Sequence, residues 1–334
     1  MKKIVLDKII QKFGTPIYLY EGNIIEKACA ELKKNLRGVN LYYACKANTN
    51  LEIIKLIYKQ GFGIETVSPG EIAITRKAGV PISKITFTCG SINEEELLSV
   101  VKQGIRVHLD SLHQVEMFGK KFPGKEISVR LNLNFGAGSH SHVITGGPNS
   151  KFGIDIKKIK DLNELVKKYN LKITGLHQHI GSNVLDANTF LKGVKALLEN
   201  ALLFPDLKHL DFGGGFGVPY KPSDKSLDMA KVGKEFKKMT SIFFKKYGRK
   251  LEVSFEPGRY LIAEAGSLIT QVNDLKINSV KTFVGVNSGL NHFIRPAMYD
   301  AYHEIINLSN PRGKGEKVTI AGNMCESGDV FAKD

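Results

Sequence analysis

The chain has 334 residues, more than one small domain needs, and 42% of them are hydrophobic, which is enough for a sizeable core. Its formal net charge of +15 comes from 48 Lys and Arg against 33 Asp and Glu, spread as single lysines or lysine pairs along expected helix faces. The sequence has no long basic arm and no interleaving of aromatic and basic residues. This pattern favours solvated helix faces over a nucleic-acid surface.

The N-terminus and the cysteines indicate a cytoplasmic protein. The first apolar run is interrupted by Asp7 and is too short for a signal peptide, and no stretch approaches the length of a membrane span. The cysteines form neither a CxxC pair nor a metal-ligand spacing, which favours reduced thiols and no bound metal. They are Cys29, Cys45, Cys89 and Cys325.

Strand and helix patterns alternate eight times along the middle of the chain. The expected strands are Val39–Ala44, Gly63–Val67, Lys84–Thr88, Ile105–Leu109, Ile127–Leu133, Ile173–His179, Leu207–Asp211 and Leu251–Phe255. Helical patterns between them include Leu51–Gln60, Glu71–Ala78, Glu94–Lys102, Ile156–Lys168, Phe190–Glu199 and Met229–Lys246. Eight such units in about 220 residues match a (β/α)₈ barrel better than the alternative, a doubly wound open sheet. We therefore expect an α/β fold with a TIM-like barrel over residues 38–264.

The two ends of the chain do not follow this alternation of strands and helices. Residues 1–37 hold one expected strand, Ile17–Tyr20, and one expected helix, Ile24–Leu36. Residues 265–334 begin a β domain with the expected strands Leu268–Leu275, Lys281–Val286 and Lys317–Ala321, and the N-terminal strand is a candidate to pair with it. Because a stable sheet needs more strands, we expect the sequence to be incomplete at its C-terminus. The longest irregular stretch, residues 134–150, is expected to be a functional loop.

Unusual polar residues follow the expected strands at their carboxyl ends, where barrel enzymes place their active sites. They are Lys46 after strand one, Glu65 and Ser68 at strand two, His177–Ser182 at strand six, Gly213–Gly217 after strand seven and Glu256–Arg259 after strand eight.

Lys46 is the first candidate catalytic residue. Strand alternation places Tyr42, Ala44 and Lys46 on one face, which we take to be the inner face of the barrel. An inward lysine is costly unless its charge is compensated or removed, and a covalent bond to an aldehyde cofactor is one use for it. The alternative is an ordinary lysine beyond the strand end.

The glycine run and the Glu256–Arg259 turn are candidates for holding a cofactor. Glycines allow backbone N–H groups to approach a phosphate, and the loops after strands seven and eight of barrels often bind one. Glu256 could pair with a pyridine nitrogen, and Arg259 could bind a phosphate or carboxylate. The alternatives are a glycine-rich turn and a plain Glu–Arg ion pair.

Two further motifs allow chemistry. His177 and His179 lie on one face of strand six; stacking of an imidazole on a flat cofactor suits them better than metal binding, because no further ligands are evident. The Cys325–Asp329 segment could deliver a proton from its thiol. The alternatives are a satisfied core histidine and an ordinary turn.

In this order the motifs resemble those of the barrel-type (fold type III) pyridoxal-phosphate decarboxylases, and within that group those of the diaminopimelate decarboxylases. The resemblance covers the whole chain. It is carried by Thr15–Tyr18, Tyr43–Asn48, Gly146–Gly153, His177–Ser182, Gly213–Gly217, Glu256–Arg259, Arg295–His303 and Cys325–Asp329. It implies decarboxylation of meso-2,6-diaminopimelate to L-lysine and carbon dioxide, the last step of lysine biosynthesis, with pyridoxal 5'-phosphate as cofactor.

The resemblance also implies roles for single residues. Lys46 would hold the cofactor covalently, His179 would stack on its ring and Glu256 would pair with its pyridine nitrogen. The phosphate or ring would be held by Ser182, Gly213, Gly214, Gly215, Glu256, Pro257, Gly258 and Arg259. The distal carboxylate of the substrate would contact Arg259, Arg295 and Tyr299, and Glu326 would recognise its distal amino group. Cys325 would donate the proton that replaces carbon dioxide, and it would come from the other subunit of a homodimer.

The sequence differs from the family pattern in two respects, and three alternative functions are weighed against it. Glu65 stands where relatives usually carry Asp, and relatives continue beyond residue 334 to a late tyrosine. The same chemistry could act on carboxynorspermidine, ornithine or arginine, but Arg295 and Tyr299 favour a distal acid. The Cys325–Glu326 pair argues against an alanine-racemase-like enzyme. The start of a β domain argues against a non-catalytic barrel that only binds the cofactor.

Overall fold

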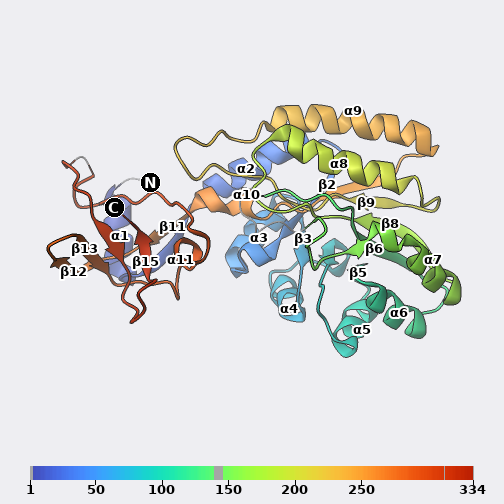
Figure 1. Cartoon of the computed structure of the whole chain (residues 1–334), viewed down its shortest axis with the longest axis horizontal. Helices are drawn as coiled ribbons and strands as arrows, with labels where there is room; N and C mark the ends of the chain where they lie inside the picture. Colours follow the sequence, from blue (N-terminus) through green and yellow to red (C-terminus); the bar gives the residue numbers. More distant parts are fainter. Residues whose placement is uncertain (1–2, 139–145, 312, 334) are drawn as a thin grey trace. The chain divides into compact units, whose positions relative to one another are not determined.

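The computed structural model describes residues 3–138, 146–311 and 313–333, which fold into two compact units (Figure 1). The barrel unit comprises Gly22–Val218 and Ser226–Glu264. The β unit comprises Met1–Glu21, Pro219–Lys225 and Ala265–Asp334. Part of the expected loop 134–150 lies outside the described residues. Within the described ranges, no helix has the length and apolar character that crossing a bilayer requires.

Eight parallel strands close into a barrel in the described part of the barrel unit. They are β2 (Asn40–Ala44), β3 (Gly63–Thr66), β4 (Ile85–Phe87), β5 (Arg106–Leu109), β6 (Glu126–Asn132), β8 (Lys172–His177), β9 (His209–Asp211) and β10 (Glu252–Phe255). Each strand pairs with the next in this order, and β10 pairs with β2, while the short β7 (Ile154–Asp155) is added beside β6. The closed order confirms the predicted TIM-like barrel and excludes the open sheet.

Helices follow the strands because local signals start them. The barrel unit holds α2 (Gly22–Asn35), α3 (Leu51–Lys59), α4 (Pro69–Lys77), α5 (Glu94–Lys102), α6 (Leu112–Lys121), α7 (Ile159–Lys168), α8 (Ala187–Ala201), α9 (Met229–Tyr247) and α10 (Arg259–Ile262). Side chains of Asn50, Ser68 and Asp186 cap α3, α4 and α8 by accepting backbone N–H groups of the first turn. Helix α2 packs against α3, α9 and α10, so the barrel unit begins at Gly22 rather than at residue 38.

The β unit holds the N-terminal strand and the strands after the barrel. Its elements are α1 (Lys3–Phe13), β1 (Ile17–Tyr20), β11 (Gly266–Ile269), β12 (Val272–Ile277), β13 (Thr282–Val286), α11 (Arg295–Tyr299), β14 (Thr319–Ala321) and β15 (Val330–Ala332). Strand β1 pairs antiparallel with β11, and β12, β13, β14 and β15 form a separate sheet in that order. The prediction of one strand over Leu268–Leu275 was wrong. The chain changes its pairing partner after Ile269, which divides this stretch between two sheets.

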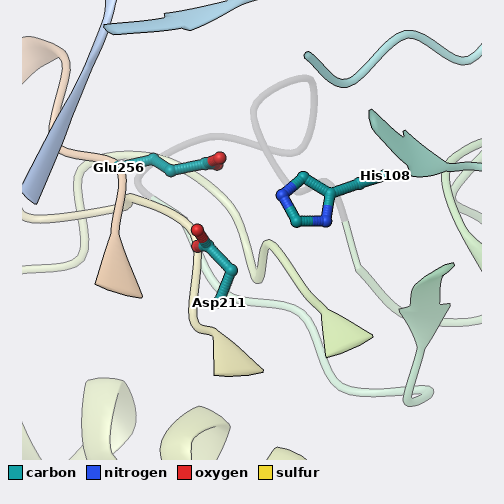
Figure 2. Close-up of side chains that lie close together, drawn as sticks. All are labelled: His108, Asp211 and Glu256. Atoms are coloured by element: carbon teal, nitrogen blue, oxygen red, sulfur yellow. The ribbon is translucent and has the colours of Figure 1, made fainter. Parts of the chain in front are cut away.

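The interior of the barrel is polar. Rings of His108 on β5 and His177 on β8 lie with centroids 4.7 Å apart although β6 separates their strands, so they meet inside the barrel. Buried acids and a base lie there as well, and Figure 2 shows the side chains of Glu256, Asp211 and His108 close together. Branched apolar side chains usually fill such a barrel, and buried charges are costly unless they are paired. This polar interior therefore indicates a functional site.

Candidate active site

Lys46 lies in a short 3₁₀ turn, Cys45–Ala47, directly after β2. The strand ends at Ala44, so the alternation used to place Lys46 does not extend to it. Its side chain nevertheless reaches the next strand, where Lys46 Nζ lies 3.5 Å from Glu65 Oε2. The Lys46 side chain is half exposed and that of Glu65 is buried. The Lys46 side chain thus extends from a solvent-accessible position to a buried carboxyl group in the polar interior.

Glu65 is a buried carboxyl group with few partners that could stabilise its negative charge. Within the described residues neither of its oxygens accepts a hydrogen bond, and Lys46 is its ion-pair partner. Burial raises the pKa of Glu65 to about 8, although the positive charge of Lys46 acts to lower it. The group therefore exchanges a proton within the range in which enzymes work.

Glu256 follows the last residue of β10 and is 5% exposed. Its Oε2 lies 2.9 Å from His177 Nε2, whereas Oε1 has no hydrogen-bond partner among the described residues. Burial raises the pKa of Glu256 to about 7, and the charges of Lys46 and Arg130 oppose this rise. Burial also holds the pKa of His177 well below its usual range. A neutral His177 can donate to Glu256 Oε2 and leave Oε1 for another donor.

The glycines after β9 occupy positions where a side chain would not fit. A Cβ at Gly213 would lie 2.3 Å from Gln178 O, and one at Gly214 would lie 2.4 Å from Glu256 O. Gly213 and Gly215 also have φ of +67° and +105°, which side-chain-bearing residues rarely adopt. The segment Gly213–Gly215 therefore packs as bare backbone between Glu256 and the end of β8.

His179 and the Ser182–Arg259 pair border this glycine segment. The His179 ring is half-buried, and its Nδ1 accepts the Gly214 N–H at 3.1 Å. Burial holds the pKa of His179 well below its usual range, so the ring is neutral. Arg259 donates from Nε and Nη2 to Ser182 Oγ, at 3.2 and 3.0 Å. Strand β8 ends at His177, two residues earlier than predicted, so His179 belongs to the loop.

Three residues of the polar interior were not assigned a role from the sequence. Arg130 on β6 lies 3.4 Å from Asp110 and is 8% exposed. His108 Nδ1 lies 2.7 Å from Ser128 Oγ. Asp211, at the end of β9, accepts the Gly213 N–H at 2.8 Å. Of these three, Arg130 could have been singled out from the sequence, because it is a charged residue inside an otherwise largely apolar strand.

The remaining candidates belong to the β unit. The Arg295 guanidinium lies 5.0 Å from the Tyr220 ring centroid and 5.8 Å from that of Tyr299, and its Nε donates to His303 Nε2 at 3.2 Å. Cys325 is exposed and has no disulfide partner among the described cysteines. Glu326 Oε1 accepts the Gly328 N–H at 3.3 Å. The structure thus groups Arg295 with Tyr299 in one unit, and Lys46, Glu256, His179 and Arg259 in the other.

The family model of the pyridoxal-binding domain of pyridoxal-dependent decarboxylases matches residues 22–263, which cover the whole barrel. The chain belongs to the pyridoxal-dependent decarboxylases. This membership confirms the resemblance predicted from the motifs, and it makes pyridoxal 5'-phosphate the cofactor.

Curated relatives and solved structures agree with this assignment. The diaminopimelate decarboxylase of Methanothermobacter thermautotrophicus is 36% identical and aligns with 98% of this chain and 79% of its own length. That of Aquifex aeolicus is 35% identical, with 99% and 80% covered. A crystal structure of a diaminopimelate decarboxylase superposes with a TM-score of 0.91 at 31% identity, covering 99% of this chain and 80% of its own. The Helicobacter pylori enzyme in complex with L-lysine has a TM-score of 0.86 at 31% identity, with 98% and 84% covered.

The residues of this barrel fit the cofactor of the family. Glu256 Oε1 is a buried acceptor without a partner, which suits a protonated pyridine nitrogen. The bare backbone of Gly213–Gly215 and the Arg259 guanidinium suit a phosphate. Lys46 is the amine within reach of the buried acids. The barrel thus offers an amine, a buried acceptor and a phosphate-sized stretch of bare backbone, which suit this cofactor.

Proposed function

We propose that this chain decarboxylates meso-2,6-diaminopimelate to L-lysine and carbon dioxide. The observation that carries the proposal is the 32–36% identity to curated diaminopimelate decarboxylases along nearly the whole chain. The alignments include the β unit, where the proposed substrate ligands Arg295, Tyr299 and Glu326 lie, and not only the cofactor-binding barrel. Rival substrates of the same chemistry are ornithine, arginine and carboxynorspermidine.

In this proposal the barrel residues hold and tune the cofactor. Lys46 bonds covalently to the aldehyde, and Glu256 pairs with the pyridine nitrogen. Gly213–Gly215, Ser182 and the Pro257–Arg259 turn would hold the phosphate, and the neutral His179 ring would hold the pyridine ring. When bound, pyridoxal phosphate supplies the electron sink that accepts the bonding pair of the departing carboxylate. The negative charge of Glu256 keeps the ring nitrogen protonated and so strengthens that sink.

The substrate ligands are proposed from charge and chemistry. The distal end of meso-diaminopimelate carries one carboxylate and one ammonium group. Arg295 and Arg259 offer guanidinium groups and Tyr299 a hydroxyl for the carboxylate, and Glu326 offers a carboxylate for the ammonium. The Cys325 thiol supplies the proton that takes the place of carbon dioxide. A distal acid in the substrate is what separates this function from decarboxylation of ornithine or arginine.

We also propose that the chain acts as a homodimer in the cytoplasm. Each active site would combine the barrel of one subunit with Cys325 and Glu326 of the other. The solved complex of a relative with L-lysine supports a small amino acid as the partner of the site.

The test is direct. The purified chain is incubated with pyridoxal phosphate and meso-diaminopimelate, and carbon dioxide and L-lysine are quantified. Equimolar formation of both is the expected result. Ornithine, arginine and carboxynorspermidine are supplied in parallel; faster turnover of any of them would replace the substrate, and absence of carbon dioxide from all four would overturn the enzymatic function.

A further inference from the structure

Asp211 is a buried carboxyl group to which the proposed function gives no role. It ends β9 and is 1% exposed. One ligand atom each of Asp211, Glu256 and His108 lies within 4.8 Å of the others (Figure 2). Two acids thus share one small volume inside the barrel, where two negative charges would repel each other strongly.

The surroundings of the two acids differ. The charge of Glu256 is supported by Lys46 and Arg130 and by the His177 N–H. Asp211 Oδ1 accepts the Gly213 N–H, and Oδ2 lies 2.5 Å from Ser254 Oγ. Burial and then the Glu256 carboxylate raise the pKa of Asp211 well above its usual range, opposed by the hydrogen bonds with Ser254 and Gly213. The cations therefore favour a charge on Glu256, and the proton of the pair belongs on Asp211.

Other titratable and charged groups facing the pair do not change this distribution. Burial holds the pKa values of His108 and His177 well below their usual range and lowers that of His209 to about 4, so these three histidines are neutral. The groups around the pair are Tyr42 and Lys46 at β2, Glu65 on β3, Arg106 and His108 on β5, Arg130 on β6, His177 on β8 and His209 on β9. The guanidinium of Arg106 donates to both carboxylate oxygens of Glu252, which offset its charge.

We propose that Asp211 stays a neutral carboxylic acid in the folded barrel, so that Glu256 is the acid of the pair that ionises, and that Asp211 positions Gly213 for the phosphate. Asp211 is a positioning residue, because it contacts Gly213 and Ser254 and acts on the cofactor through them. Its positioning role rests on the proposed cofactor function, whereas its protonation state does not.

Urea unfolding of the cofactor-free protein between about pH 5.5 and 7.5 tests the protonation state. The folded wild type keeps a proton on Asp211 that the unfolded chain loses above its ordinary pKa. The unfolding constant of the wild type should therefore rise with pH more steeply than that of Asp211→Asn, by about tenfold per pH unit. An equal slope in the two proteins would show that Asp211 is ionised when folded and would overturn the proposal.

Asp186→Asn is the matched control. Asp186 caps α8 by accepting the Thr189 N–H, which lowers its pKa, so it is ionised in both states over this range. The slope of Asp186→Asn should equal that of the wild type. Added Zn²⁺ gives a second check. If Zn²⁺ stabilised the wild type but not Asp211→Asn, a cation rather than a proton would balance the two acids, and the proposal would fail.

Cofactor titration followed by absorbance tests the positioning role. Asn keeps the shape and the acceptor of a neutral acid, so Asp211→Asn should bind pyridoxal phosphate within about threefold of the wild type. Asp211→Leu, compared once circular dichroism shows it folded, should bind at least about tenfold more weakly because the Gly213 N–H loses its acceptor. Weak binding by Asp211→Asn, or normal binding by Asp211→Leu, would contradict the role. If the wild type itself failed to bind, the proposed function would fail, while the unfolding slopes would still report the proton.

Discussion

Lys46 Nζ lies 3.5 Å from Glu65 Oε2, and the two residues come from adjacent strand ends. Ala44, the last residue of β2, is in register with Glu65 on β3, and the turn that follows carries Lys46 across to the neighbouring strand. Glu65 is buried, and its pKa is raised to about 8 even with the positive charge of Lys46 beside it, so the group is mostly protonated at neutral pH. Removing the Lys46 charge raises this pKa further. A covalent bond at Lys46 Nζ is therefore linked to the protonation of Glu65.

Lys46→Ala should abolish covalent attachment of pyridoxal phosphate at little cost in stability. Removing one partner of a buried ion pair usually costs about 3–5 kcal/mol, because a charge remains unpaired. Here Lys46 is half exposed and Glu65 is already mostly protonated at neutral pH, so we expect a loss of only about 1 kcal/mol. Urea unfolding gives the stability, and borohydride reduction followed by mass spectrometry gives the attachment.

The exposed Lys55, which pairs with Glu52 on α3, supplies the control. Lys55→Ala should keep the covalent cofactor. Retention of a reducible cofactor bond in Lys46→Ala would assign the attachment to another lysine. A stability loss of several kcal/mol would show that Glu65 remains ionised.

Gly214→Ala should damage cofactor binding through the backbone. The new Cβ would lie 2.4 Å from Glu256 O, a backbone atom that cannot move without shifting the carboxylate. We expect a stability loss of about 1–3 kcal/mol, and a cofactor affinity at least about tenfold weaker. Thermal unfolding and absorbance titration measure the two effects. Gly70→Ala is the control, because its Cβ would meet only Ser68 Oγ, at 3.8 Å, and both quantities should stay close to the wild type. A Gly214→Ala variant that matched this control would refute the tight fit.

The barrel could be predicted from the sequence because each strand is a local pattern. The eight β-branched runs and the glycines after β9 signal their structure within a few residues. The break between β11 and β12 could not be predicted in the same way. It is caused by a change of pairing partner, which is a long-range property.

The polar interior shows the same limit within the site. Alternation predicts that His177 and His179 share one face of their strand, but not that His177 Nε2 meets Glu256 from another strand. The pairing of Asp211 with Glu256 likewise exists only after the barrel closes. Lys46 was placed inward by alternation, although a 3₁₀ turn rather than the strand carries it to Glu65. Motif resemblance supplied the residues of the site, and the folded barrel supplied their partners.

Cofactor affinity should depend on pH through Glu256. Its pKa in the cofactor-free barrel is raised to about 7, so below that pH the carboxylate is protonated and must release a proton to pair with a protonated pyridine nitrogen. The affinity advantage of the wild type over Glu256→Gln should be about ten- to a hundredfold above pH 7 and should shrink as the pH falls. Absorbance titrations at several pH values measure it.

Glu199→Gln is the control for this profile, because Glu199 is exposed on α8 and its pairing with Lys195 is a surface contact. It should reproduce the wild-type pH dependence. A constant ratio between the wild type and Glu256→Gln across the range would mean that Glu256 does not titrate there.

Arg295→Met should weaken the recognition of the substrate's distal carboxylate. Loss of a charge-assisted hydrogen bond costs about 1.5–3 kcal/mol, so kcat/KM for meso-diaminopimelate should fall about ten- to a hundredfold. The cofactor affinity should not change, because Arg295 is assigned to the substrate alone. Steady-state kinetics and absorbance titration separate the two quantities. Arg37→Met, at an exposed arginine after α2, should leave kcat/KM unchanged. A loss of cofactor affinity in Arg295→Met would move this residue to the cofactor site.

Mixed dimers test whether two subunits share each site. Lys46→Ala disables a barrel and Cys325→Ala removes the proton donor of the β unit, so each variant alone should be nearly inactive. If the sites are shared, half of the dimers formed after subunit exchange are mixed, and each of these contains one site with both Lys46 and Cys325. The mixture should recover about a quarter of the wild-type rate of carbon dioxide release.

The control pairs two barrel variants, Lys46→Ala and Glu256→Gln. Both residues lie in the barrel unit, so exchange between these variants never creates an intact barrel and should recover no activity. Recovery in the first mixture but not in the second can arise only when Cys325 serves the barrel of the partner. If neither mixture recovered activity although native mass spectrometry showed mixed dimers, each site would be built from a single chain, and the proposed sharing of Cys325 would be wrong.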